Sequence, residues 1–140
     1  MVRAYLAVAL GGLIGTGLRL AFDLAFPRSD GELPIETLLV NLGGTFALGW
    51  LVGGLWTRPS MPTWLKAGIG PGVLGSFTTL SAVMASLLLL TREGESWLAG
   101  LYLLVSVAGG LGLAAAGLRI GSLTAHRPMP TEVTDAGETL

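Results

Sequence analysis

The sequence predicts an all-α integral membrane protein with four transmembrane helices, the third of them broken near its middle. Hydrophobic residues make up 51% of the 140 residues and charged residues only 12%, which is about half the charged fraction of an ordinary soluble domain. Four stretches of about 20 mostly apolar residues, the length that crosses the hydrocarbon core of a bilayer, follow one another. A lipid bilayer, at the cell membrane, is therefore the expected surrounding of this chain.

The four apolar stretches are separated by short connectors. The stretches run over residues 4–26, 35–56, 65–90 and 97–123, and the connectors over residues 27–31, 58–62 and 91–95. The connectors are rich in proline, glycine, serine and charged residues, which interrupt helices. We therefore expect one transmembrane domain over residues 1–126 and a polar, disordered tail over residues 127–140. His126, the only histidine, is expected to be a solvated residue at this border.

The first stretch has features of a secretory signal, because Arg3 precedes an apolar run. A cleaved signal would end at a small-residue cleavage site. The stretch instead continues through Arg19 and Asp23 without such a site, so we interpret it as a retained helix.

The basic residues favour cytoplasmic termini only weakly. Four spans place both termini on one side, which holds five basic residues, Arg3, Arg58, Lys66, Arg119 and Arg127. The other side holds three, Arg19, Arg28 and Arg92. Basic residues gather on the cytoplasmic side of membrane proteins. A bias of five against three also permits insertion in both orientations.

Several classes of function are disfavoured by composition. The net charge of −1 provides no basic field for nucleic acid. The chain has no cysteine, and without a nucleophile–base pair or a histidine within the spans an enzyme is a poor candidate. A non-channel small transporter is a further alternative, but proton coupling requires an acid in mid-membrane. Asp23 and Glu36 instead lie near the ends of spans.

Glycines at a spacing of four residues predict closely packed helices. The chain has 22 glycines, and three pairs with this spacing are Gly11 with Gly15, Gly49 with Gly53, and Gly117 with Gly121. Small residues at this spacing let helix backbones approach each other closely in lipid.

Polar residues within the spans need partners away from lipid. Asn41 lies in an apolar run, where it either joins two helices or lines a polar cavity. Arg19 and Asp23 are four residues apart near the end of the first span, a spacing that predicts an intrahelical ion pair. A functional role of Arg19 is the alternative.

The third stretch contains an unusual combination of glycine, proline and hydroxyl residues. Pro71 removes a backbone donor and disfavours helix at Gly70, and Gly75 lets the backbone leave helical dihedral angles at low cost. A run of hydroxyl residues that can satisfy the freed backbone groups follows: Ser76, Thr78, Thr79 and Ser81. We expect a true break, with a kink at Pro71 as the alternative. Carbonyls exposed at such a break favour a cation, and exposed N–H groups favour an anion.

Three stretches of the chain resemble the signatures of one family. These are residues 12–19, 37–46 and 75–81, which contain the patterns Gly-x-x-Gly, Thr-Leu-x-Val-Asn and Gly-x-x-Thr-Thr-x-Ser. They occur in the same order as in the family and cover nearly the whole chain. They resemble the small fluoride channels called Fluc or CrcB.

The resemblance implies an antiparallel dimer with two pores that export fluoride passively from the cytoplasm. It also implies a structural, non-transported sodium ion at the dimer centre, held by the backbone carbonyls of Gly75 and Thr78. The fluoride path would then contain amide and hydroxyl groups, at Asn41, Thr79, Ser81, Tyr102 and Ser106. Such neutral donors suit fluoride, because a fixed charge would bind this small, strongly hydrated ion too tightly.

The sequence departs from the family just after the break. The family places phenylalanines at the two positions that hold Leu80 and Val83 here, and their ring edges would contact the permeating ion. Ala82 replaces a hydroxyl residue, and Gly110 stands where a small polar residue is expected. These changes lead to a hypothesis that the chain is one subunit of a heterodimer whose partner supplies the aromatic residues. A homodimer is the alternative.

Overall fold

The computed structural model describes residues 2–26 and 33–125, all of which are helical or lie in short connections. The elements are α1 (Val2–Ala25), α2 (Ile35–Gly53), the 3₁₀ helix η1 (Leu55–Thr57), α3 (Thr63–Ala67), the π-helical η2 (Gly68–Leu74), α4 (Gly75–Phe77), α5 (Leu80–Arg92) and α6 (Ser96–Ala125). The predicted tail, the first connector and His126 lie outside the described residues, so the border at residue 126 stays a prediction.

The helices form four spans that are long and apolar enough to cross a membrane. The spans run over Val2–Ala25, Ile35–Thr57, Thr63–Arg92 and Ser96–Ala125. These bounds lie close to those expected from the sequence, and the prediction of an all-α protein with four transmembrane helices is confirmed.

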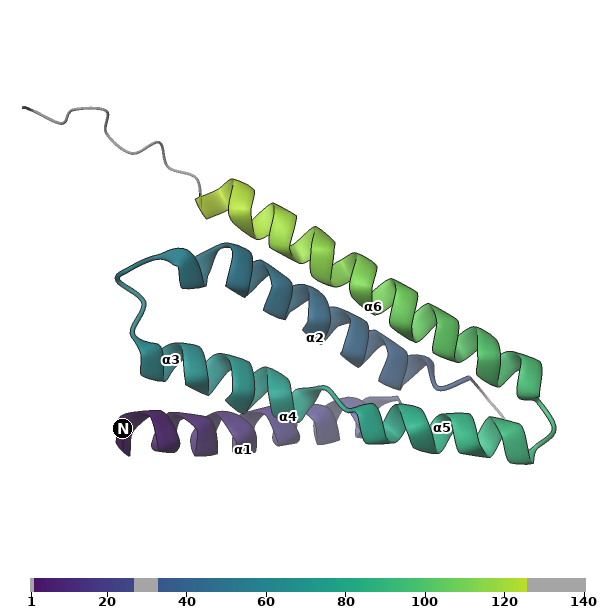
Figure 1. The fold of residues 1–140 in the computed structure, drawn as a ribbon. Helices are drawn as coiled ribbons and strands as arrows, with labels where there is room; N and C mark the ends of the chain where they lie inside the picture. The colour runs from purple at the N-terminus through teal and green to yellow at the C-terminus, as the bar shows by residue number, and fades with distance from the viewer. Residues whose placement is uncertain (1, 27–32, 126–140) are drawn as a thin grey trace, which may run out of the picture.

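The spans are arranged as two associated pairs (Figure 1). α2 packs along the length of α6, and α1 packs against the first part of the third span, chiefly η2. α5 then continues the third span and packs against α6. The start of α1, the connection between α2 and α3, and the end of α6 lie at the same end of the bundle (Figure 1).

Glycines make the close approach of α2 and α6 possible. A methyl group added at any of four glycines would overlap backbone atoms of the other helix. These glycines are Gly49 and Gly53 on α2 and Gly117 and Gly121 on α6. Because lipid provides no hydrophobic force between helices, van der Waals contact between the backbones replaces it.

The same principle governs the contact between α1 and the third span. Added methyl groups at Gly11 and Gly15 would overlap the carbonyl groups of Gly68 and Val73. Both glycines are buried in α1, although most of that helix is exposed. The glycine pairs noted in the sequence are therefore all at helix contacts.

Few large side chains are buried within one chain. The main cluster lies between α5 and α6 and contains Val83, Leu90, Ala99 and Tyr102. Large apolar side chains are exposed along every span, among them Leu13 at 72% and Leu111 at 69%. Such surfaces are stable only against lipid or another protein chain.

Replacing Gly117 with alanine should lower the thermal stability of the protein in detergent, because the added methyl group overlaps the Phe46 carbonyl. Overpacking of this kind costs about 1–3 kcal/mol. Gly112→Ala on the same helix is the matched control, since its methyl group meets nothing within 4 Å. Tryptophan fluorescence during heating measures both. Equal melting temperatures of the two variants would contradict the packing account.

Candidate functional site

The third span has two extended residues at its middle. α4 ends at Phe77, and Thr78 (φ −84°, ψ 151°) and Thr79 (φ −149°, ψ 123°) separate it from α5, which begins at Leu80. Backbone groups next to such an interruption lose their usual helical partners.

The two extended residues lie slightly later in the chain than Gly70 and Gly75, where the sequence favours a departure from helix. Gly70 and Pro71 belong to the π-helical η2, and Gly75 keeps helical dihedral angles (φ −65°, ψ −27°). A π-helical turn shifts the hydrogen-bond pattern by one residue, so a proline without an N–H is accommodated there without ending the helix. Within the third span, the residues with extended backbone are Thr78 and Thr79.

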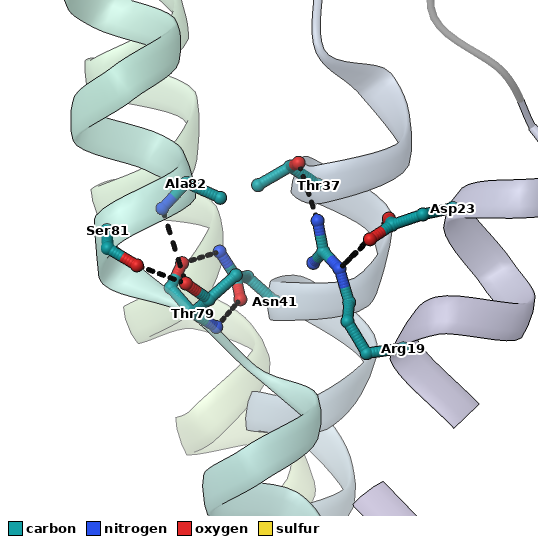
Figure 2. A network of polar contacts seen from close by, with 7 residues as sticks. All are labelled: Arg19, Asp23, Thr37, Asn41, Thr79, Ser81 and Ala82. Carbon is teal, nitrogen blue, oxygen red and sulfur yellow. Dashed lines mark hydrogen bonds and ion pairs between the residues drawn. The ribbon is translucent and has the colours of Figure 1, made fainter. Parts of the chain in front are cut away.

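Asn41 holds the extended backbone of Thr79 by two hydrogen bonds (Figure 2). Its Nδ2 donates to the Thr79 carbonyl at 2.9 Å, and its Oδ1 accepts from the Thr79 N–H at 2.8 Å. Both polar ends of one amide side chain therefore bind the main chain of one residue on another span. We call this pair of bonds the Asn41–Thr79 clamp.

The start of α5 is capped by the side chain of Thr79. Its Oγ1 accepts from the Ala82 N–H at 3.2 Å and lies 2.9 Å from the Ser81 hydroxyl (Figure 2). Threonine is a favoured N-cap residue because its hydroxyl satisfies an N–H that has no helical partner. The side chain of Thr78 donates backwards to the Leu74 carbonyl at 2.9 Å.

The clamp and the cap redirect two N–H groups. In a continuous α-helix the Thr79 N–H would bond to the Gly75 carbonyl and the Ala82 N–H to the Thr78 carbonyl. Here the first donates to Asn41 and the second to the Thr79 hydroxyl. The carbonyls of Gly75 and Thr78 thereby lose these donors.

A cavity of about 490 Å³ adjoins the interruption. Its lining comes from α2, the third span and α6: Asn41, Thr45, Gly75, Thr78, Thr79, Leu80, Val83, Met84, Leu103, Ser106 and Val107. No side chain in this lining carries a formal charge. A second cavity, of about 290 Å³, shares Thr45, Gly75 and Thr78 with the first.

The cavity contains three of the five residues predicted for a fluoride path. Asn41, Thr79 and Ser106 line it, and the Ser106 Oγ is buried without a hydrogen-bond partner among the described residues. Tyr102 is only 2% exposed and lies in the cluster between α5 and α6. Ser81 is exposed and bonded to Thr79. Neither Tyr102 nor Ser81 is part of the lining.

The two positions that differ from the family also adjoin the cavity. Leu80 and Val83 both line it, but Leu80 is 71% exposed whereas Val83 is 5% exposed. Phe77 ends α4 ahead of the interruption and is not in the lining.

Arg19 and Asp23 form an ion pair one helical turn apart, with the Arg19 Nε 3.0 Å from the carboxylate. Arg19 also donates from Nη2 to the Thr37 hydroxyl at 3.0 Å (Figure 2). Its Nη1 is buried without a partner in the described part of the chain. The pair therefore joins α1 to α2 as well as bridging one turn of α1.

Sequence reasoning missed Thr37 and Thr45. With Asn41 they form a line of polar residues spaced four apart, which shares one face of α2. Thr37 contacts Arg19, and Thr45 lines the cavity. The line itself is visible in the sequence and would have identified both residues as facing polar partners.

The fold and the cavity define a small multi-pass membrane protein with a polar cavity beside two extended residues of its third span. The model of the family described as CrcB-like protein, Camphor Resistance (CrcB), matches residues 6–118. This match covers most of the chain, and the protein belongs to the CrcB family.

Relatives of the chain are similar over most of their own length. A protein of Geobacillus kaustophilus named Fluoride-specific ion channel FluC 2 is 36% identical over 108 residues, covering 76% of this chain and 84% of the relative. The Fluoride-specific ion channel FluC of Azotobacter vinelandii is 38% identical over 127 residues, covering 88% of this chain and 100% of the relative. The Fluoride-specific ion channel FluC of Chelativorans sp. is 40% identical over 105 residues, covering 74% of this chain and 84% of the relative.

Replacing Asn41 with alanine should expose the Thr79 N–H and carbonyl. Losing a partner costs about 1–3 kcal/mol for a fully buried polar group, and Thr79 is half-buried, so the lower part of that range, roughly 10-fold in local opening, applies. We therefore expect hydrogen exchange at residues 78–82 to accelerate by roughly that factor, measured by mass spectrometry in detergent. Thr45→Val is the control, because among the described residues its hydroxyl bonds to the Asn41 carbonyl of its own helix and not to Thr79. Unchanged exchange in Asn41→Ala would contradict the clamp.

Proposed function

We propose that this chain is a fluoride-specific ion channel that lets fluoride leave the cytoplasm passively. The observation that carries the proposal is the cavity at the interruption, whose polar groups are neutral amide and hydroxyl donors. Fluoride is small and strongly hydrated, so a path must replace its water with hydrogen-bond donors without trapping it at a fixed charge. The names of the relatives agree with this chemistry.

The start of α5 adds a second attraction for an anion. α5 has 13 residues, and the N-terminus of a helix carries a partial positive charge and N–H groups without helical partners. Its first residue, Leu80, and its N-cap, Thr79, both line the cavity. Asn41, Thr79 and Ser106 would then receive fluoride beside these groups. Tyr102 and Ser81 would act from outside the present lining.

We further propose that a structural sodium ion is held by the carbonyls of Gly75 and Thr78. These two carbonyls fit the ion because the N–H groups that would otherwise engage them bond to Asn41 and the Thr79 hydroxyl. Hard cations prefer oxygen ligands, and carbonyl dipoles replace their hydration shell in other membrane proteins. When bound, sodium would supply a positive charge that holds the extended segments in place.

A second copy in the opposite orientation would raise the number of carbonyl ligands at this site from two to four. Two carbonyls are too few for a hard cation, which takes about six oxygen ligands. Gly75 is exposed and Leu80 is 71% exposed beside it, so the proposed ligands lie on a surface that a partner can reach. We therefore propose an antiparallel dimer.

The partner is either identical or a similar chain. The aliphatic residues Leu80 and Val83 line the cavity at positions where ring edges would stabilise an anion. This observation favours a heterodimer in which the partner supplies the aromatic side chains. The ion pair of Arg19 and Asp23 has a structural role in either assembly, since it joins α1 and α2 through Thr37.

Fluoride efflux from proteoliposomes tests the channel directly. Vesicles containing the purified chain are loaded with potassium fluoride, and valinomycin starts efflux that a fluoride electrode follows. We expect efflux that exceeds protein-free vesicles, excludes chloride and is independent of a pH gradient. Efflux that requires a proton gradient would indicate a coupled transporter. Absence of efflux from both this chain and the variant described next would contradict the channel.

The double variant Leu80→Phe, Val83→Phe tests the need for a partner. An aromatic contact contributes about 0.5–1.5 kcal/mol, so two of them should raise fluoride efflux by roughly 10–100-fold. Leu104→Phe is the control, because Leu104 is 63% exposed on α6 and lies outside the cavity lining. Equal efflux from the original chain and the double variant would show that a homodimer needs no aromatic residues there.

A further inference from the structure

A groove separate from the cavity lies between the start of α1 and the start of α3. Its volume is about 360 Å³, and its lining is Arg3, Leu6, Ala7, Leu10 and Trp64. None of these residues lines either cavity at the interruption. The groove therefore has no part in the proposed ion path.

The lining residues on α1 form one face of the helix. Arg3, Leu6, Ala7 and Leu10 are spaced by three and four residues, the spacing that places side chains on the same side of a helix. Leu6 and Leu10 are 58% and 61% exposed. A helix rises 1.5 Å per residue, so this face extends about 10 Å along the span from the guanidinium-bearing residue to Leu10. One end of the groove is cationic and the rest is apolar.

The groove lies at the basic end of the bundle. Four basic residues lie towards this end, Arg3, Arg58, Lys66 and Arg119, whereas the acidic residues in the described part lie towards the other: Asp23, Glu36, Glu93 and Glu95. Lys66 donates to the Trp56 carbonyl. Arg3 forms no ion pair with any described residue, since the one such pair is Arg19 with Asp23. The guanidinium of Arg3 is thus available to an outside anion.

Trp64 indicates that the groove lies at the level of the membrane interface. It lies in the first turn of the third span and is 40% exposed. Tryptophan gathers at the level of lipid headgroups because its ring is apolar and its N–H is polar. Arg3 at the opposite wall lies one residue inside the first candidate span, so both walls lie at the ends of spans, the level at which headgroups are expected.

We propose that this groove binds a phospholipid with an anionic headgroup. The Arg3 guanidinium donates to the phosphate oxygens, and one acyl chain lies against Leu6, Ala7 and Leu10 below it. Arginine binds phosphate through two parallel N–H donors, and basic residues at the end of a span attract anionic lipids. The apolar side chains next to Arg3 favour a lipid over a free phosphate, because a free phosphate would not contact Leu6 and Leu10.

Native mass spectrometry of the full chain in detergent tests the site. The delipidated protein is titrated with dioleoylphosphatidylglycerol and, separately, with dioleoylphosphatidylcholine. We expect at least one phosphatidylglycerol to bind in preference to phosphatidylcholine. Arg3→Gln should weaken that binding by about tenfold, as expected for lost hydrogen bonds to a charged group, and Arg3→Lys should retain most of it.

Arg92→Gln is the matched control, because Arg92 is an exposed arginine at the end of α5, on the opposite side of the membrane. It should bind phosphatidylglycerol as the original chain does. Unchanged binding by Arg3→Gln would overturn the proposal, and so would equal binding of both lipids. If glycerol phosphate displaced bound phosphatidylglycerol as effectively as added phosphatidylglycerol does, the acyl chain would contribute nothing to binding, and the lipid proposal would be wrong. If Arg3→Gln changed the oligomeric state but not the amount of bound lipid, the groove would be a contact between protein chains, and the lipid proposal would be wrong. None of these outcomes depends on fluoride transport.

Discussion

The two hydrogen bonds between Asn41 and the backbone of Thr79 are the interaction on which the site depends. A span in lipid must satisfy its own backbone groups, so an interruption is stable only where other protein groups replace the lost helical partners. Asn41 supplies one donor and one acceptor to a single residue, and the Thr79 hydroxyl caps the next helix. These bonds use the N–H groups that would otherwise engage the carbonyls of Gly75 and Thr78. The interruption is therefore stabilised, and the carbonyls of Gly75 and Thr78 are left without these two helical donors.

The packing of the glycine-rich helices positions this clamp. Asn41 lies on α2, which is held against α6 by backbone contact at glycines such as Gly49 and Gly117. Ser106 lies on α6 and lines the same cavity, so the distance between these polar groups is set by how closely the two helices approach. A bulkier residue at the contact would move the walls of the cavity as well as weaken the pair. The stability of the helix pair and the dimensions of the cavity thus share one structural cause in this fold.

The sequence predicted the four spans well because span length and apolar composition follow directly from the bilayer. It left Asn41 open between joining helices and lining a cavity, and the structure shows that it does both. The position of the interruption was less predictable, since η2 accommodates Pro71 in a π-helical turn and moves the extended residues to Thr78 and Thr79. The burial of Tyr102 was not predictable either, because α6 is apolar on all sides and its sequence does not identify the face that meets α5. The contact of Arg19 with Thr37 joins two helices, and spacing within one helix cannot reveal it.

The most direct test of this account is the sodium response of the Asn41→Ala variant. Thermal unfolding in detergent is compared in sodium chloride and in N-methylglucamine chloride, for the original chain, Asn41→Ala and Thr45→Val. A ligand that binds only the folded state raises its stability by mass action. Sodium should raise the melting temperature of the original chain and of Thr45→Val but not of Asn41→Ala, because the clamp redirects the Thr79 N–H that would otherwise engage the Gly75 carbonyl, one of the two proposed ligands. An equal sodium response in Asn41→Ala would contradict this account.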